Sequence, residues 1–215
     1  MVTEEQIKEN YTKFFEYLKD DSRIENIKKM YDAFGVRIVE APASMRTYWH
    51  NCFPGGYIDH VVRVCETSVE VTRLFKKMGG TINFNKQELI FAALHHDLGK
   101  LGTPEYPYYL DQESDWHRKR GELYKMNDNV QYMRVTDRAA FLLQQFDIKL
   151  TENEWLAIKL SDGLYTEGND PYLKTSHYPY AMHTNLPYII HTADHLSATV
   201  ERDQTRVNLE DESGI

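Results

Sequence analysis

The sequence has few cysteines and no long hydrophobic run. Cys52 and Cys65 are its only thiols among 215 residues, too few for a disulfide framework, and they indicate a reducing, cytoplasmic setting. No apolar run approaches the roughly 20 residues that a membrane helix needs. The N-terminal segment MVTEEQIKEN is acidic and amphipathic, unlike a secretory signal peptide. We therefore expect a soluble, cytoplasmic protein with no membrane partner.

The chain also lacks an excess of positive charge. It has 25 Lys and Arg residues against 33 Asp and Glu residues, which gives a formal net charge of −8. Proteins that bind duplex nucleic acid generally need a basic face, so this balance argues against that function. It does not exclude a small phosphorylated substrate that a metal ion and a few local cations hold. The oligomeric state is left open.

Repeats and low-complexity linkers are absent as well, and a chain of 215 residues fits a single domain. Apolar spacing and capping patterns predict helices over about residues 3–20, 22–35, 56–77, 85–97, 136–146, 151–163 and 186–203. The N-terminal caps are expected at Thr3, Ser22, Asn85, Thr151 and Asn185. Alternation around YYLDQ and ELYKM allows one small β-hairpin near residues 106–126. The predicted fold class is all-α.

Three of these helices carry ligand-type side chains at positions that look buried, namely His60, His96 with Asp97, and Asp194. Burying such groups unpaired is costly, and one shared divalent cation would satisfy all four. Two imidazoles and two carboxylates suit Mn²⁺, Fe²⁺, Co²⁺ or Ni²⁺, and Mg²⁺ is compatible. On a six-coordinate ion they leave two positions, for water and for a phosphate oxygen. The alternative is four polar groups that are satisfied separately at helix ends.

The order of these residues, with the glycines around them, resembles a known family. Gly56 lies four residues before His60 in GGYIDH, the segment HHDLGK contains an HD dipeptide followed by GK, and Asp194 follows an alanine inside the last helix. This set resembles the HD-domain metal-dependent phosphohydrolase superfamily over about residues 40–203, with small phage-type HD hydrolases as near kin. The GG-x-x-x-H start is similar to that of HD domains of the 3′→5′ exoribonuclease type.

The resemblance implies an HD-domain helical bundle at about residues 40–203, an N-terminal helical extension at 1–35 and an acidic tail at 204–215. It also implies that His60, His96, Asp97 and Asp194 bind the metal, and that Asp97 and Lys100 are catalytic, with Lys100 on a substrate phosphate. A lysine three residues past a ligand can reach a phosphate on the same ion. The alternative is that Lys100 is a solvated cation at a helix end.

A second metal ion depends on His117 and Asp162. Two-metal relatives add histidines between the HD dipeptide and the final Asp, and this chain has Ser161-Asp162-Gly163 where many of them have His-His-Gly. One ion is therefore expected, and a second on His117 or Asp162 is left open. His117 is otherwise expected beside the reacting phosphate as an acid or donor, and Arg118 and Arg120 are expected to bind substrate phosphates. The alternatives are that His117 is a surface histidine and that Arg118 and Arg120 belong to a solvated run of charges.

The remaining histidines and tyrosines are less informative. His95 is about 100° from His96 around the helix and is expected to pack or to support the site. His50 lies close to the glycine turn and could be near the site or have no role. His191 shares a helix side with Asp194, whereas His195 is expected to face elsewhere. Tyrosines within residues 106–110 and 164–180 could stack on a base or pack the loops.

The sequence therefore predicts a metal-dependent phosphohydrolase that acts on a nucleotide phosphate ester or anhydride through a metal-activated water. Nucleoside mono- and triphosphates and cyclic nucleotides are the expected substrates. The alternatives are a di-iron oxygenase on the same fold, a 3′→5′ exonuclease on short single strands, and a non-catalytic nucleotide-binding module. In a viral source the compartment would be the host cytoplasm.

Overall fold

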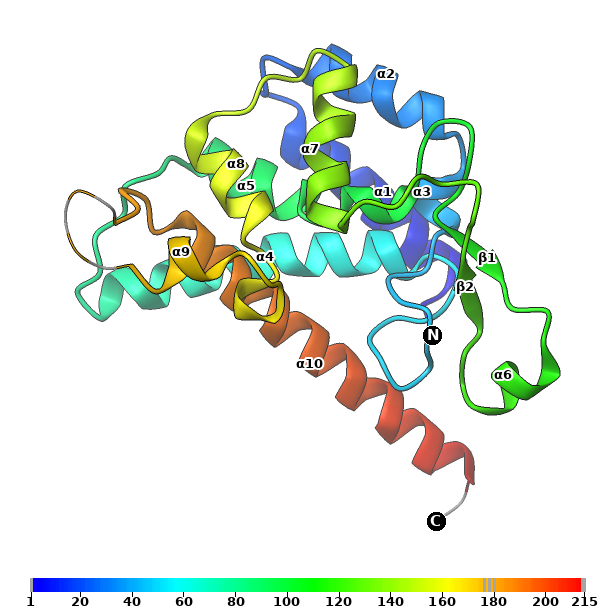
Figure 1. Cartoon of the computed structure of the whole chain (residues 1–215). Coiled ribbons are helices and arrows are strands. Elements are labelled where there is room, and N and C mark those ends of the chain that lie inside the picture. The colour runs from blue at the N-terminus through cyan, green and yellow to red at the C-terminus, as the bar shows by residue number, and fades with distance from the viewer. Residues whose placement is uncertain (1, 176, 178, 180, 214–215) are drawn as a thin grey trace.

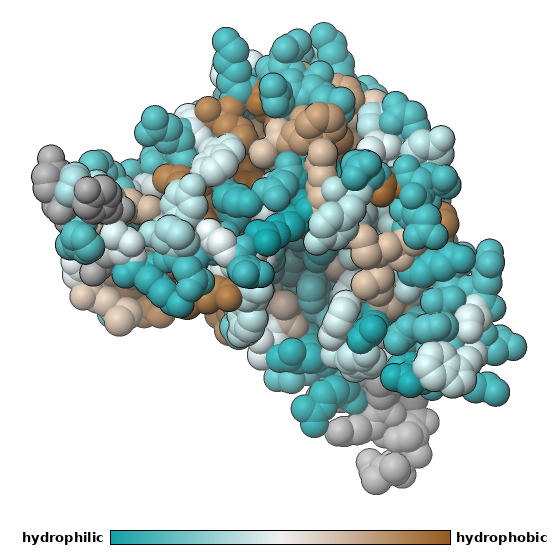
Figure 2. Space-filling view, in the orientation of Figure 1, coloured by the Kyte–Doolittle hydropathy of each residue, from teal (hydrophilic) through white to brown (hydrophobic). Residues whose placement is uncertain are grey.

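A computed structural model of the chain describes residues 2–175, 177, 179 and 181–213. It is largely helical (Figure 1), which confirms the all-α prediction, and its surface carries many hydrophilic residues (Figure 2). No helix in these ranges is both long enough and apolar enough to cross a membrane. The helices are α1 (Glu4–Leu18), α2 (Ile24–Phe34), α3 (Arg37–Glu40), α4 (Gly56–Lys77), α5 (Lys86–His95), α6 (Asp115–Lys119), α7 (Val135–Gln145), α8 (Glu152–Lys159), α9 (Asp170–Leu173) and α10 (Leu186–Ser213).

A two-stranded hairpin and two 3₁₀ turns accompany these helices. The elements are η1 (Leu98–Leu101), β1 (Tyr109–Asp111), β2 (Tyr124–Met126) and η2 (Gly163–Tyr165). The strands pair antiparallel with Leu110 opposite Lys125, so the hairpin predicted near residues 106–126 is confirmed. Helix α6 lies between the two strands, and this arm projects from the helical body in Figure 1. An isolated bridge between Arg46 and Glu122 joins the arm to the loop before α4.

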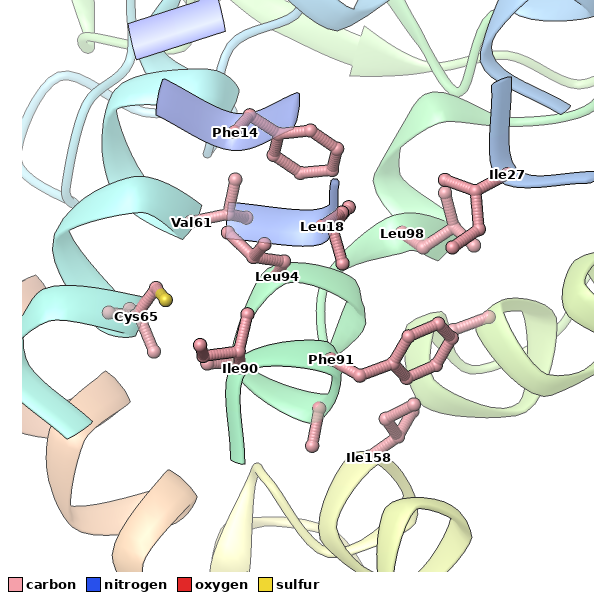
Figure 3. Close-up of a cluster of buried hydrophobic side chains, with 14 of the residues drawn as sticks. Phe14, Leu18, Ile27, Val61, Cys65, Ile90, Phe91, Leu94, Leu98 and Ile158 are labelled. Atoms are coloured by element: carbon pink, nitrogen blue, oxygen red, sulfur yellow. The ribbon is translucent and has the colours of Figure 1, made fainter. Parts of the chain in front are cut away.

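Helix α5 lies in the centre of the hydrophobic core. Its residues from Glu88 to His95 are all buried, and it packs against α1, α4, α8 and α10. Figure 3 shows Ile90, Phe91 and Leu94 of this helix among apolar side chains from α1, α4 and α8. Full burial of one such side chain contributes about 1.5–3 kcal/mol. This packing fixes the C-terminal end of α5, where the HD dipeptide begins.

The capping residues that the sequence predicts for α1, α5 and α8 are confirmed. The Thr3 hydroxyl accepts the amide of Gln6. Asn85 with Glu88, and Thr151 with Glu154, form reciprocal capping boxes. These patterns are local, so the residues within one turn suffice to specify them.

Several helix boundaries differ from the sequence prediction. Helix α8 ends at Lys159 and not near residue 163. Ser22 does not cap α2, because the helix begins after Arg23 and the Asp21 carboxylate accepts the Arg23 amide at 2.8 Å. Helix α10 does not end near residue 203 but continues to Ser213, through most of the segment expected as an acidic tail. The expected cap Asn185 instead donates its side-chain amide to the Thr81 carbonyl, and the Thr184 hydroxyl accepts the amide of Leu186.

The glycine pair before α4 sets the direction of that helix. Gly55 is its N-cap and has a φ of 82°, a left-handed conformation that glycine adopts without strain. A Cβ on Gly56 would lie 2.1 Å from the carbonyl oxygen of Asn51, so a larger residue would displace the loop. The side-chain amide of Asn51 in turn donates to Asp59 at 2.9 Å. The start of α4 and the loop before it therefore form one packed unit.

Candidate metal centre

Helices α4, α5 and α10 bring together the four side chains that the sequence singles out. Nε2 of His60 on α4 lies 3.1 Å from Oδ1 of Asp194 on α10 and 3.6 Å from Oδ2 of Asp97. Nε2 of His96, the C-cap residue of α5, lies 3.6 Å from Asp194 and 3.7 Å from Asp97. Both imidazoles are buried, and the two carboxylates face them at the edge of a cavity.

The donor atoms of this cluster fit a divalent ion. Nε2 of His60 and Nε2 of His96 are buried and have no hydrogen-bond partner among the described residues. Their Nδ1 atoms are engaged, since His96 donates to the Ala93 carbonyl at 2.8 Å and His60 donates to Glu201 at 3.0 Å. Ligands in adjacent positions on an ion with bonds of about 2.1 Å are about 3.0 Å apart. The shortest observed separation, 3.1 Å, is close to that value, and the other three are 3.6–3.7 Å.

The two carboxylates also determine the electrostatics of the centre. Burial lowers the pKa of His60, but Glu201 and Asp194 outweigh burial and raise that pKa to about 10. Burial alone would raise the pKa of Asp194, and the contacts with His60 and His96 hold it well below its ordinary value. The site therefore stabilises positive charge between its carboxylates. A cation that binds there replaces protons on the imidazoles.

Lys100 lies against the carboxylate of Asp97. It is in η1, directly after the HD dipeptide, and its Nζ is 2.6 Å from Oδ2 of Asp97. Burial favours the neutral amine, yet the attraction of Asp97 prevails and raises the pKa of Lys100 above its ordinary value. Gly99 permits this turn to pack closely, because a Cβ there would lie 2.2 Å from the Val135 carbonyl oxygen. The ammonium group is thus held at the cavity wall.

The cluster opens into a cavity of about 780 Å³. Figure 2 shows this face of the molecule hollowed near its centre, with largely hydrophilic residues around the hollow. Asp97, Lys100 and Asp194 lie in the cavity wall, and exposed aromatic side chains form part of its lining. Those aromatic residues are Trp49, Tyr132 and Tyr165.

Three further histidines line the same cavity: His50, His191 and His195. His191 donates from Nδ1 to the Ser161 carbonyl at 2.7 Å. His195 stacks on Tyr165 with ring centroids 5.9 Å apart, so the expectation that it faces elsewhere is wrong. His50 is close to His60, with ring centroids 4.5 Å apart.

Asp162 also lies in the cavity wall but apart from the four-residue cluster. Its Oδ2 accepts the hydroxyl of Thr166 at 3.2 Å. Burial, with Asp97 nearby, raises the pKa of Asp162 above its ordinary value. Among the described residues it belongs to neither of the two groups of three His, Cys, Asp or Glu donors that could hold an ion.

The structure does not bring His117, Arg118 or Arg120 to the cavity lining. All three belong to α6 or its C-cap, on the arm that projects from the body. Nδ1 of His117 lies 2.6 Å from Glu122, and its side chain is 41% exposed. Arg118 donates to the Gln112 carbonyl at 3.2 Å, and Arg120 lies over the Trp116 ring. The hairpin carries these residues away from the helical body, and their role at the mouth of the site stays a prediction.

Glu201 contacts the site, and sequence reasoning missed it. It is buried, and its carboxylate accepts the Nδ1 proton of His60. Glu201 lies seven residues after Asp194, which is about two helical turns and hence the same face of α10. That two-turn spacing from Asp194 is the signal that could have identified it.

Comparison with known proteins agrees with this geometry. A family model described as HD domain matches residues 57–199, and the chain belongs to this family, as the sequence predicts. Over 66 residues the chain is 32% identical to dihydroneopterin 2',3'-cyclic phosphate phosphodiesterase of Methanocaldococcus jannaschii. The aligned part is 31% of this chain and 25% of that protein, so the chain spans about a quarter of the length of this curated relative. No solved structure matches.

Proposed function

We propose that this HD-family protein is a metal-dependent phosphohydrolase that cleaves a phosphate ester or anhydride of a small nucleotide, cyclic phosphates included. The observation that carries the proposal is the pair of buried Nε2 atoms of His60 and His96, which lack hydrogen-bond partners among the described residues and face two carboxylates. Family membership and the phosphodiesterase relative support the reaction class.

In this proposal His60, His96, Asp97 and Asp194 hold the ion, with Mn²⁺, Fe²⁺, Co²⁺, Ni²⁺ or Mg²⁺ as the candidates. A bound divalent ion supplies Lewis acidity, which activates water and polarises phosphorus. The protein keeps the two imidazoles in the tautomer that leaves Nε2 free, because Glu201 and the Ala93 carbonyl accept the Nδ1 protons.

Lys100 would neutralise charge that develops on the phosphate. Its ammonium group is already at the cavity wall, within 2.6 Å of a proposed ligand. A phosphate oxygen that approaches the ion comes within reach of the same amine, and a charge-assisted hydrogen bond there strengthens as the transition state gains charge.

Asp162 has two candidate roles that differ in metal count. Burial raises the pKa of Asp162, so this carboxyl holds a proton more readily than an exposed aspartate does and is a candidate to donate one to the leaving oxygen. As a ligand for a second ion it would have to lose that proton. Metal analysis distinguishes the two roles. One ion per chain supports Asp162 as a proton donor, and two ions support it as a ligand of the second ion.

The exposed aromatic residues of the cavity support a substrate with a planar base. Trp49, Tyr132 and Tyr165 are 40%, 74% and 81% exposed although they line the cavity. Such rings bind bases by stacking, at about 1–3 kcal/mol per base. The net charge of −8 disfavours a long polyanionic strand. A small nucleotide therefore fits this cavity better than a polymer.

A substrate screen tests the proposed function. The purified protein is incubated with nucleoside mono-, di-, tri- and cyclic phosphates in the presence of Mn²⁺, Co²⁺, Ni²⁺ or Mg²⁺, and the product is measured. We expect turnover that chelators abolish and that Asp97→Ala lacks. Turnover that requires iron and oxygen would favour the oxygenase alternative. Tight nucleotide binding with no turnover under any ion would favour a binding module.

A further inference from the structure

His50 is one of three cavity histidines to which the four-ligand pattern gives no role. It lies in the loop before α4, five residues ahead of Gly55. The Ser44 hydroxyl donates to its carbonyl at 2.6 Å, and the carbonyl of the next residue, Asn51, accepts the amide of Ala43 at 3.0 Å. Because this loop packs tightly against the first turn of α4, the ring of His50 is held in place by the fold.

The side chain of His50 reaches the proposed ligands. The donor atoms of His50, His60 and Asp97 all lie within 4.8 Å of one another, and a second group of this kind comprises His60, His96 and Asp194. The two groups share His60, so an ion bound to that residue borders both. Ligands on opposite sides of an ion with bonds of about 2.1 Å are about 4.2 Å apart. The donor atoms of the His50 group lie within 4.8 Å of one another, so a small inward shift of these side chains would bring all three onto one ion.

Nε2 of His50 is also buried without a hydrogen-bond partner among the described residues. The same is true of His95, but there the neighbours are the rings of Phe14, Tyr31 and Phe91. An unpartnered nitrogen alone therefore does not mark a ligand in this chain. His50 differs because its neighbours are an imidazole and a carboxylate of the proposed centre.

We infer that His50 is a fifth protein donor to the metal, through Nε2. This inference rests on the proposed metal centre. A third imidazole leaves one open position on a six-coordinate ion instead of two, and it shifts the preference of the site from Mg²⁺ toward transition ions. It also ties the loop that carries Trp49 to the ion, so metal binding would order one wall of the substrate cavity.

Proton NMR of the Co²⁺-loaded protein tests this inference. Each coordinated imidazole keeps one N–H, whose resonance the paramagnetic ion shifts far outside the usual range. We expect three such exchangeable resonances in the unaltered protein and two in His50→Phe, with Co²⁺ affinity at least about tenfold weaker. His195→Gln, which changes a histidine of the same cavity outside both donor groups, is expected to keep all three.

Three results would overturn the inference. Two shifted resonances in the unaltered protein, or three that persist in His50→Phe, would exclude His50 as a ligand and leave the proposed metal centre intact. A protein that binds no Co²⁺ would instead overturn the metal centre and the role of His50 together. The count in the unaltered protein decides the question even if His50→Phe does not fold.

Discussion

Glu201 and His60 form a buried hydrogen bond of 3.0 Å, behind the imidazole face that points toward Asp194. The second carboxylate oxygen of Glu201 lies 3.2 Å from Nε of Arg63, which supports its negative charge. A carboxylate that accepts the Nδ1 proton fixes the tautomer of a metal-binding histidine and makes its Nε2 more basic. Helix α10 therefore contributes to the centre twice, through Asp194 and through the orientation of His60.

Glu201→Gln is expected to weaken Mn²⁺ binding by about tenfold or more, because the amide still accepts the proton but has no charge. Fluorescence or EPR titration of the metal-free protein measures the affinity. Asp203→Asn, an exposed position on the same helix, is the matched control and should bind as the unaltered protein does. Equal affinity in the two variants would mean that the orientation of His60 does not depend on Glu201.

Asp97→Ala is expected to abolish metal binding and turnover together, since the change removes a proposed ligand. It also leaves Lys100 buried without the partner at 2.6 Å, and breaking such a pair costs about 3–5 kcal/mol of stability. Asp97→Asn keeps the shape of the side chain and should lose metal with less damage to the fold. Metal analysis, turnover and circular dichroism of both variants check this. Normal turnover in either variant would contradict the metal assignment.

Lys100→Met should retain the metal and lose activity. The methionine fills the space of the lysine stem, so the change removes mainly the charge. Loss of one charge-assisted contact to the transition state corresponds to about 1–3 kcal/mol, or roughly 5- to 150-fold in kcat/KM. Steady-state kinetics at saturating metal, with metal content measured on the same sample, give the comparison. Unchanged kinetics would assign Lys100 a structural role beside Asp97.

The parts of the fold that the sequence predicts well depend on local patterns. The bounds of α4, the capping boxes at Asn85 and Thr151, and the hairpin near residues 106–126 all follow from residues within a turn or a strand pair. The convergence of His60, His96, Asp97 and Asp194 was also foreseeable, because their helices bury apolar faces against one another. Burial and register together determine which side of each helix faces inward.

The remaining features of the site depend on tertiary placement that local patterns do not specify. His117 and Arg120 follow the acidic segment DQESD (residues 111–115) of the arm, and nothing in their spacing tells whether the arm folds over the cavity or away from it. His195 lies about 100° from Asp194 around α10, yet the cavity is wide enough to include both. Glu201 has the two-turn spacing from Asp194, but its contact with His60 depends on α10 passing behind that imidazole.

Asp21 provides a test of stability against pH away from the metal centre. Burial opposes its charge, but hydrogen bonds from Arg23 prevail and lower the pKa of Asp21 from 3.8 to about 2. Arg23 also donates to Glu154 at 2.8 Å and lies over the Phe91 ring at 3.8 Å. A carboxyl with a lower pKa in the folded state stabilises the fold above its unfolded pKa, and this contribution is lost as the pH falls toward 2.

We therefore expect Asp21→Asn to lower the free energy of unfolding at pH 7 by about 2 kcal/mol. The difference from the unaltered protein should shrink as the pH falls from about 4 toward 2, because protonation then removes the charge from Asp21 as well. Urea unfolding of the metal-free proteins at several pH values measures this difference in the free energy of unfolding. Asp20→Asn, at the exposed neighbouring position, should change stability little at any pH. A difference that stays constant with pH would show that Asp21 acts through packing and not through its charge.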